Sequence, residues 1–244
     1  MSMRQIIYKY IIPRFYHIIF GVNCTTSELN LSNSKCLCLA PHPDDESIGM
    51  GGTIRKYRDN FDVICLTDGS RAGSELTKEE LIKKRADEFE KAMKIAGVKN
   101  CRMLNLPDRE MLVNSYDHKI DISCYDYIFI PNILDQHRDH KSTSAYIKML
   151  LKTQPHKKDL KIAFYEVWTA LALPNYFVDI TQEKDCKLEM INAHQSQLKG
   201  FDYANKSIAL NKYRGLNCGK EFVESFTVCD KKLFLKILKA CGMI

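Results

Sequence analysis

The fold of this 244-residue chain is decided by the stretch KCLCLAPHPDDE at residues 35–46, which is followed by GMGG at 49–52. The apolar run 36–40 predicts a short buried strand, and the polar residues after it predict a loop at the carboxyl end of that strand. A helix is expected next, over 49–58. Working outward from this unit, we expect strands to alternate with helices.

Further apolar runs along the chain repeat the same order. The predicted strands are 62–67, 101–106, 127–131 and 161–167, and the predicted helices are 77–96 and 139–151. Thr77 and Glu80 form a capping box at the start of the longest helix, and Gly97 ends it. The alternation predicts an α/β, Rossmann-like fold whose mostly parallel sheet carries helices on both faces. Runs at 178–180 and 226–228 predict a strand pair, which together with two helices forms a small C-terminal extension.

The composition is that of an ordinary globular chain. Hydrophobic residues make up 45% and charged residues 27%, which excludes wholesale disorder, collagen and coiled coil. A net charge of +6, spread along the chain, gives no indication of nucleic-acid binding. We expect a single domain over 35–244, large enough to bury a core without metal or disulfides. A metal ion here would therefore indicate catalysis rather than structural support.

The ten cysteines include no C-x-x-C pair, which argues against a zinc knuckle or a thioredoxin-type site. Several of them fall in apolar strands, where cysteine behaves as a small hydrophobic residue. We expect reduced thiols in a cytoplasmic protein, and no secretory signal is evident.

The N-terminal segment 1–34 differs from the rest of the chain. Residues 6–20 are rich in aromatic and β-branched side chains, but the interruptions at Lys9, Arg14 and His17 make this stretch too charged to span a bilayer. The favoured interpretation is a short helix packed on the domain. The alternative is peripheral membrane contact through residues 3–20. The polar stretch 22–34 is predicted to be a linker.

The loop after the first strand gathers chemistry-bearing side chains. His42, Asp44, Asp45 and Glu46 lie within five residues, at the sheet edge where α/β proteins bind their ligands. Burying three carboxylates is costly unless a cation or another partner compensates them. A divalent metal would do so, and imidazole with carboxylate is a ligand mix that suits zinc.

A second polar motif, DQHRDH at 135–140, follows the strand 127–131. His137 and His140 are three residues apart at a strand-to-helix junction and can point to the same place. Asp139 could orient one of the rings. Each motif alone has a simpler explanation, a capped helix start or a chance His-x-x-His. Both at one sheet edge favour a site with three protein ligands and an open position.

These motifs resemble the PIG-L/LmbE-type family of zinc-dependent de-N-acetylases, over about residues 35–230. The signature PHPDDE at 41–46 with the following Gly-Gly carries the resemblance, and HRDH at 137–140 supports it. Weaker similarities are TDG at 67–69, Arg85-x-x-Glu88, LPD at 106–108, EVW at 166–168 and HQSQ at 194–197. Family members act on N-acetylglucosaminyl-phosphatidylinositol and on the sugar precursors of mycothiol and bacillithiol.

The resemblance implies a hydrolase that removes the N-acetyl group from an N-acetylglucosamine-type conjugate, releasing acetate and a free amine. The implied zinc (Zn2+) ligands are His42, Asp45 and His140. Asp44 is implied as the general base toward the attacking water, and His137 as the protonated group that stabilises the oxyanion and helps the amine leave.

The resemblance also implies residues around this centre. Arg85, Asp108 and Arg71 would contact the substrate, and Glu46 and Asp139 would support the centre from behind. Some relatives carry Tyr two residues before the first His of the later motif, where this chain has Asp135.

Several alternatives stay open. The same ligands also suit Fe2+. Arg85 could pair with Glu88 on the helix surface, and Asp108 could be a turn residue. The chain could be an inactive carbohydrate- or lipid-binding module. A nucleotide-binding transferase is disfavoured, because the glycines at 49–52 lack the Lys-Ser/Thr of a phosphate loop. The basic, aromatic N-terminus slightly favours a lipid-linked or envelope precursor as substrate.

Overall fold

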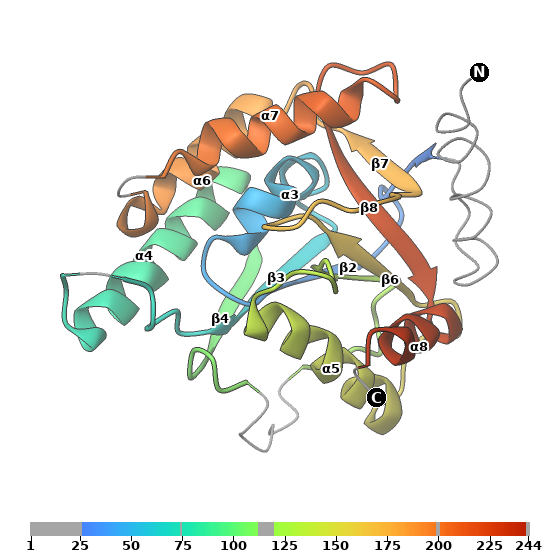
Figure 1. Ribbon diagram of the computed structural model, residues 1–244, viewed down its shortest axis with the longest axis horizontal. Helices are drawn as coiled ribbons and strands as arrows, with labels where there is room; N and C mark the ends of the chain where they lie inside the picture. The colour runs from blue at the N-terminus through green and yellow to red at the C-terminus, as the bar shows by residue number, and fades with distance from the viewer. Residues whose placement is uncertain (1–25, 74, 112–119, 199–200, 243–244) are drawn as a thin grey trace.

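The computed structural model describes residues 26–73, 75–111, 120–198 and 201–242 (Figure 1). Eight strands form one sheet in the order β1-β7-β8-β6-β5-β2-β3-β4. The strands are β1 Ser27–Glu28, β2 Cys36–Ala40, β3 Phe61–Thr67, β4 Asn100–Leu106, β5 Tyr127–Pro131, β6 Lys161–Tyr165, β7 Tyr176–Asp179 and β8 Val223–Asp230. The helices are α3 Asp45–Lys56, α4 Lys78–Ala96, α5 Arg138–Thr153, α6 Lys184–Ala193, the 3₁₀ turn η2 Gln195–Gln197, α7 Tyr203–Gly215 and α8 Lys231–Ala240.

The five strands β4, β3, β2, β5 and β6 are all parallel to one another. Strand β8 is antiparallel to both β6 and β7, and β1 is parallel to β7. The predicted strand pair at 178–180 and 226–228 therefore exists as β7 and β8, with Val178 opposite Glu224. The predicted mostly parallel α/β sheet is confirmed.

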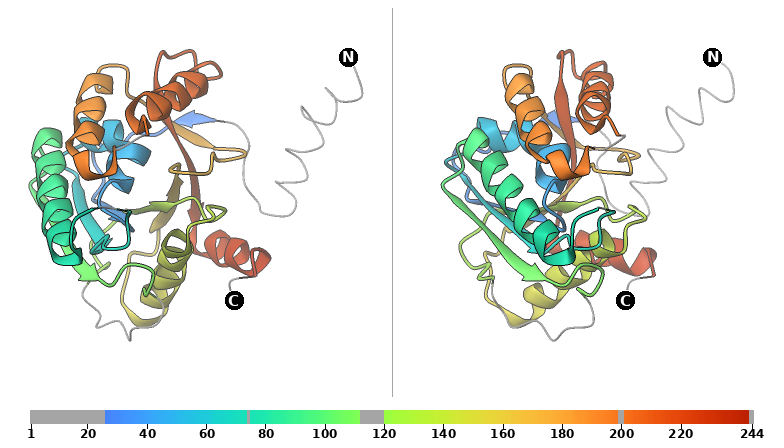
Figure 2. Two further views of the ribbon diagram at one scale, coloured as in Figure 1. Left: turned by 60° about the vertical axis from the view of Figure 1, so that its left-hand side comes forward. Right: turned by 90° about the vertical axis from the view of Figure 1, so that its left-hand side faces the viewer.

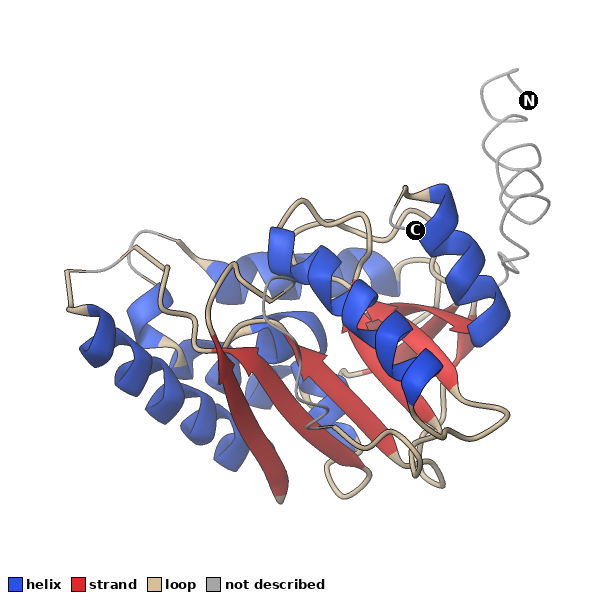
Figure 3. Cartoon of the chain, turned by 90° about the horizontal axis from the view of Figure 1, so that it is seen from below, coloured by secondary structure: helices blue, strands red, loops and turns tan. Residues whose placement is uncertain are grey.

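Alternate residues of the parallel strands divide the core into two layers. In β2, Cys36 and Cys38 face a layer that includes residues of α3, α4 and α6. Leu37 and Leu39 point the other way, into a layer that includes residues of α5 and α8. Helices thus cover both faces of the sheet, as Figures 2 and 3 show. A strand that is buried on both faces has to be apolar throughout, which explains the continuous run CLCLA.

Helix α3 begins at Asp45, four residues before the predicted start at 49. The glycines within it are packing residues, because a Cβ on Gly49 would lie only 2.4 Å from the Tyr165 ring. This close packing accounts for the glycine without a phosphate loop, which the sequence already disfavours. The other differences at element ends are small. Helix α5 starts one residue early, at Arg138, and β6 ends at Tyr165 instead of 167. The capping box of Thr77 and Glu80 is confirmed.

The polar stretch that the sequence predicts as a linker is only partly described. Residues 26–34 are part of the domain, since β1 pairs with β7 and the side chain of Leu31 is fully buried. The N-terminal helix that the sequence favours, and the alternative of membrane contact through residues 3–20, both lie outside the described residues. Within the described ranges, no helix is both long enough and apolar enough to cross a membrane.

The cysteines of the described ranges are all free thiols. Burial raises the pKa of Cys38 and Cys65 well above the ordinary value, so these thiols are protonated and unreactive. They fill the core as the sequence predicts.

Candidate active site

Two loops meet at the carboxyl edge of the sheet. Strands β2 and β5 are parallel neighbours in register, with Cys36 opposite Tyr127, so the loops that follow them emerge side by side. The first loop, at 41–44, runs into α3, and the second, at 132–137, runs into α5. The two polar motifs of the sequence are thereby brought to one place, as expected at the carboxyl ends of parallel strands.

Three imidazole rings converge at this place. The ring centroid of His42 lies 4.5 Å from that of His137 and 5.5 Å from that of His140, and the last two are 5.0 Å apart. His137 precedes the first residue of α5, and its Nδ1 accepts a hydrogen bond from the backbone N–H of Asp139. The structure therefore brings the three predicted histidines together from segments almost 100 residues apart.

Asp45 lies between two of these rings. Its Oδ2 is 3.1 Å from Nδ1 of His42 and 3.1 Å from Nε2 of His140. The contact with His140 lacks the direction of a hydrogen bond, and among the described residues neither nitrogen of that ring makes one. Asp45 Oδ1 is also buried without a hydrogen bond to a described residue. Buried nitrogen and oxygen atoms without hydrogen-bond partners are suited to coordinate a cation that lies between them.

The outer nitrogens of these two rings, Nε2 of His42 and Nδ1 of His140, point away from Asp45 and face other carboxylates. Nε2 of His42 lies 3.1 Å from Asp139 Oδ2 and 3.5 Å from Asp108 Oδ1. Nδ1 of His140 lies 3.3 Å from Asp135 Oδ2. A carboxylate behind an imidazole fixes the ring and increases its basicity, which is the usual arrangement behind metal-binding histidines.

Two groups of three residues have ligand atoms close enough together to hold one metal ion. One is His42, His137 and His140, and the other is His42, Asp108 and Asp139. Asp45 stands in neither group, although it lies within 3.1 Å of nitrogens on two of the histidines. The described residues could thus bind a divalent cation, and they offer more than one choice of ligands.

The protonation of these side chains depends on their burial and on the charged groups around them. Burial opposes a charge on His42 and His140, but the surrounding carboxylates outweigh it. They raise the pKa of His42 well above its ordinary value and that of His140 to about 9. For His137 the pKa is lowered, because the ring is half-buried and faces the two other imidazoles. The pKa of Asp45 is well below its ordinary value, since the two imidazoles outweigh its burial.

Asp44 is held by Arg85 and by an unusual backbone. Its φ of 152° and ψ of −27° are rare for a residue with a side chain. Arg85 Nη2 lies 3.3 Å from Asp44 Oδ2, and the guanidinium also donates to the carbonyl oxygens of Pro43 and Gly69. Burial raises the pKa of Asp44 to about 6, Arg85 opposes the rise and Asp45 adds to it.

The alternative in which Arg85 pairs with Glu88 on the helix surface is wrong. Both side chains are buried. The Glu88 carboxylate instead accepts hydrogen bonds from the backbone N–H and the hydroxyl of Ser196, at 2.8 and 2.6 Å. The weak sequence similarities at 85–88 and 194–197 thus meet in one contact, which connects α4 to η2.

Glu46 lies behind Asp44. One of its oxygens accepts a hydrogen bond from the backbone N–H of Asp44 at 3.3 Å, and the other accepts one from the Ser47 hydroxyl at 2.7 Å. Nε2 of His194 lies 3.2 Å from that hydroxyl. These buried groups fix the loop that carries Asp44.

A cavity of about 180 Å³ opens in front of these groups. The lining residues are His42, Asp44, Asp45, Arg71, Ala72, Arg85, Asp108, Arg109, His137, Trp168 and Gln197. Asp108 is buried and accepts a hydrogen bond from the backbone N–H of Arg71 at 2.9 Å. The Arg71 side chain is half exposed and pairs with Glu110.

Sequence reasoning missed two residues near the site. Asp135 contacts His140 and accepts hydrogen bonds from the backbone N–H groups of His137 and Trp168. Its place two residues before His137 was a usable signal. Arg109 lines the cavity with a positive φ of 66°, and its backbone N–H donates to Asp139. Nothing in the sequence around it predicts that position.

Residues 37–150 match the family model PIG-L, described as GlcNAc-PI de-N-acetylase. A diacetylchitobiose deacetylase of Thermococcus kodakarensis is 29% identical over 67% of this chain and 70% of its own length. A probable N-acetyl-alpha-D-glucosaminyl L-malate deacetylase 2 of Bacillus anthracis is 28% identical over 66% of this chain and 80% of its own.

The fold has solved counterparts. An N,N'-diacetylchitobiose deacetylase structure from Pyrococcus horikoshii superposes with a TM-score of 0.66 at 24% identity, covering 95% of this chain and 94% of that one. Together these matches confirm the predicted resemblance to the PIG-L/LmbE-type family, its fold and the class of enzyme, a deacetylase.

Proposed function

We propose that this homologue of the PIG-L/LmbE-type de-N-acetylases is a zinc-dependent hydrolase. It removes the N-acetyl group from an N-acetylglucosamine-type sugar conjugate and releases acetate and a free amine. The relatives' names supply the substrate class. The observation that carries the proposal is the position of Asp45 Oδ2, 3.1 Å from a nitrogen of both His42 and His140, beside an open cavity.

We assign the zinc to His42, Asp45 and His140. Ligand atoms about 2.0–2.2 Å from one zinc ion lie slightly more than 3 Å from each other, which agrees with the two 3.1 Å distances. In this assignment Asp139 and Asp135 hold the outer nitrogens of the two imidazoles. When bound, zinc polarises the acetamide carbonyl and makes an attacking water more acidic.

Asp44 is the proposed general base. Its carboxylate lines the cavity next to Asp45, and a pKa of about 6 leaves it ionised yet basic at neutral pH. It would take a proton from the attacking water and pass it to the leaving amine. Arg85 holds the carboxylate in place through the contact at 3.3 Å.

His137 is the proposed donor to the oxyanion. The hydrogen bond from Asp139 N–H occupies its Nδ1, which places the proton of the neutral ring on Nε2. The lowered pKa favours this neutral form over the protonated form that the resemblance implies. A single N–H aimed at the developing charge contributes on the order of 3 kcal/mol to catalysis.

The remaining polar groups of the cavity would bind substrate. Asp108 offers a carboxylate to sugar hydroxyls, and the exposed Arg71 faces the group attached to the sugar. We place the enzyme in the cytoplasm, where free thiols such as Cys124 and Cys241, both exposed, persist.

A panel of N-acetylglucosaminides tests the activity directly. We expect zinc-loaded protein to release acetate, and Asp44→Asn to lower kcat by about 100- to 10,000-fold. Asp59→Asn is the matched control, because that carboxylate is exposed and pairs with the surface cations Arg58 and Lys99. Full activity of metal-stripped protein would overturn the mechanism, and no acetate from any sugar would overturn the function.

Metal content shows which carboxylate belongs to the ligand set. Asp45→Asn should abolish stoichiometric zinc, whereas Asp108→Asn should retain it, as measured by elemental analysis after dialysis. The reverse result would assign the metal to His42, Asp108 and Asp139 instead. The same measurement on protein purified without oxygen decides between zinc and Fe2+.

A further inference from the structure

A second hollow adjoins the catalytic cavity. It has a volume of about 500 Å³ and is lined by residues of α3, of the segment after β6, and of α7 and the turn before it. Trp168 lines both spaces, so the hollow lies next to the place where the acetamide would be cleaved. Its aromatic lining residues are Trp168, Phe201 and Tyr203.

These three rings form one exposed cluster. The Trp168 and Tyr203 centroids are 5.3 Å apart, and the Phe201 and Tyr203 rings lie 5.6 Å apart and nearly parallel, at 7°. Trp168 is 47% exposed and Phe201 57% exposed, although both are large and apolar. Contiguous exposed aromatic rings next to a polar site are typical of a ligand-binding surface, because folding alone gains little from them.

The polar groups around the cluster limit the chemistry of the ligand. The Glu166 carboxylate forms an ion pair with Arg214, and the Ser207 hydroxyl donates a hydrogen bond to the carbonyl oxygen of Ile48. Lys206 lies over the Phe201 ring, with Nζ 5.8 Å from the centroid. The neighbouring Asp202 carboxylate has a lowered pKa, mainly because Asn205 donates hydrogen bonds to it and to a smaller extent because of Lys206. A single lysine with a neighbouring carboxylate makes a poor site for a phosphate or another strong anion.

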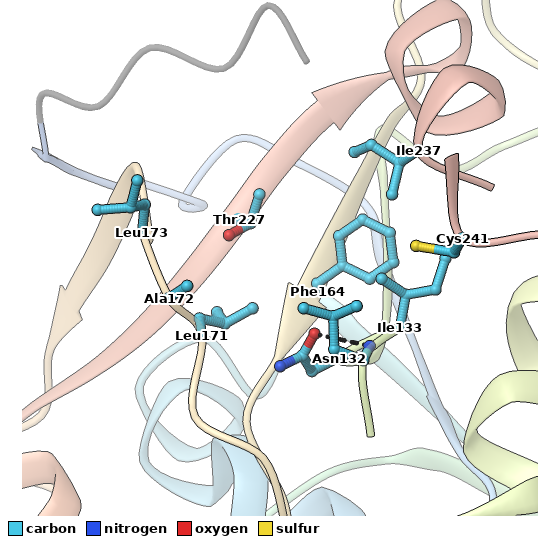
Figure 4. A pocket seen from close by; sticks show the side chains of 10 residues that line it. Asn132, Ile133, Phe164, Leu171, Ala172, Leu173, Thr227, Ile237 and Cys241 are labelled. Carbon is cyan, nitrogen blue, oxygen red and sulfur yellow. Dashed lines mark hydrogen bonds between the residues drawn. The ribbon is translucent and has the colours of Figure 1, made fainter. Parts of the chain in front are cut away.

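An acyl chain fits less well, because acyl chains are bound by aliphatic walls. This protein has such a pocket elsewhere. The pocket in Figure 4 is lined by Ile133, Leu171, Leu173 and Ile237, among others, and shares no residue with the catalytic cavity. The hollow at Trp168 instead joins aromatic faces to a polar rim. A pyranose ring has the complementary surface, an apolar C–H face bordered by hydroxyls.

We propose that Trp168, Phe201 and Tyr203 form a subsite for a second sugar ring, joined to the acetamido sugar that occupies the catalytic cavity. This inference rests on the proposed function and specifies its substrate as at least a disaccharide. Asp135 connects the subsite to the catalytic centre. Its carboxylate contacts His140 and accepts a hydrogen bond from the backbone N–H of Trp168.

Tryptophan fluorescence tests the subsite without catalysis, because Trp168 is the single tryptophan of the chain. Zinc-loaded, full-length Asp44→Asn protein is titrated with N-acetylglucosamine and with its β-1,4-linked disaccharide. We expect saturable changes in emission and a Kd for the disaccharide about tenfold lower, the size of one well-packed aromatic contact.

Further variants in the same background test which ring is responsible. Phe201→Ala should remove most of the difference between the two Kd values, and Phe201→Tyr should keep it. Tyr213→Ala is the matched control, since this tyrosine is 60% exposed and does not line the hollow. It should keep the full difference.

The outcomes separate the two proposals. Equal Kd values for the two sugars, or a difference that survives Phe201→Ala, would overturn the subsite, while acetate release by the unmodified enzyme would leave the proposed function intact. A Kd difference that depends on Phe201, without acetate release from any sugar of the panel, would support the subsite and overturn the deacetylase assignment.

Discussion

Asp44 bears two energetic costs at once. Its backbone occupies a region that disfavours side chains, which costs on the order of 1–3 kcal/mol. Its carboxylate is buried beside that of Asp45, and the raised pKa records how poorly the fold accommodates the charge. A residue that served folding alone would need neither this backbone conformation nor this buried charge. Such costs persist at positions where the chemistry, and not stability, selects the residue.

The pH dependence of kcat/KM should report this carboxylate. A base with a pKa of about 6 is protonated below that pH, so activity should rise with pH and level off above it. Arg85 lowers the pKa of Asp44, so Arg85→Met should move the acidic limb to higher pH as well as reduce the rate. Initial rates between pH 4.5 and 8.5 measure both effects.

The control for this shift is Arg58→Met, which removes an exposed cation that faces Asp59. It should leave the limb where it is. If the limb also stays in place in Arg85→Met, the acidic limb belongs to a group other than Asp44.

Individual elements show why much of the site could be predicted from the sequence. The strand–loop–helix units of β2 with α3 and β5 with α5 are local patterns, and parallel pairing necessarily brings their loops to one edge. The two polar motifs could therefore be expected at one sheet edge from the sequence, whereas the choice of His42, Asp45 and His140 as zinc ligands came from the family resemblance. The tertiary contacts were not predictable in this way. Glu88 and Ser196 are 108 residues apart, and nothing in either segment indicates the other.

The element ends that differ have physical reasons. Helix α3 begins inside the acidic motif, where Asp45 and Glu46 occupy its first turn, although side chains with functional roles suggested a loop. Strand β1 was missed because two residues of polar sequence carry no periodic signal. Its position is decided by backbone pairing with β7.

Helix α3 allows a sharp test of its packing. Replacing a helical glycine by alanine ordinarily stabilises a protein by up to about 1 kcal/mol. For Gly49→Ala we expect the opposite, a loss of about 1–3 kcal/mol, because the new Cβ would meet the buried Tyr165 ring at 2.4 Å and the Glu166 carbonyl oxygen at 2.9 Å. In a protein of this size the corresponding fall in Tm is roughly 2–12 °C.

Thermal unfolding of Gly73→Ala provides the comparison. A Cβ at that position meets nothing within 4 Å and its φ is not positive, so Tm should change by less than about 2 °C. Equal Tm values for the two variants would mean that the Gly49 contact is relieved by small movements of α3.

The molecule as a whole is basic, with a net charge of +6, yet it concentrates carboxylates at one sheet edge. Asp44, Asp45, Asp108, Asp135 and Asp139 all lie in or directly behind the site. Without a cation, the raised pKa values of His42 and His140 mean that protons balance part of this charge. A metal ion that binds the same imidazoles has to replace those protons.

Zinc binding to the metal-stripped protein should therefore release about one to two protons near pH 7. The sign follows from the shifts. The pKa of His140 is about 9 without metal, so protons compete for its ring over the whole neutral range, and apparent zinc affinity should rise between pH 6.5 and pH 8. Calorimetric titrations in buffers of different ionisation enthalpy count the protons. His156→Gln, which alters a ring outside the cluster, should release as many. An affinity that is flat with pH and no proton release would mean that zinc binds elsewhere, or that the imidazoles are neutral before it arrives.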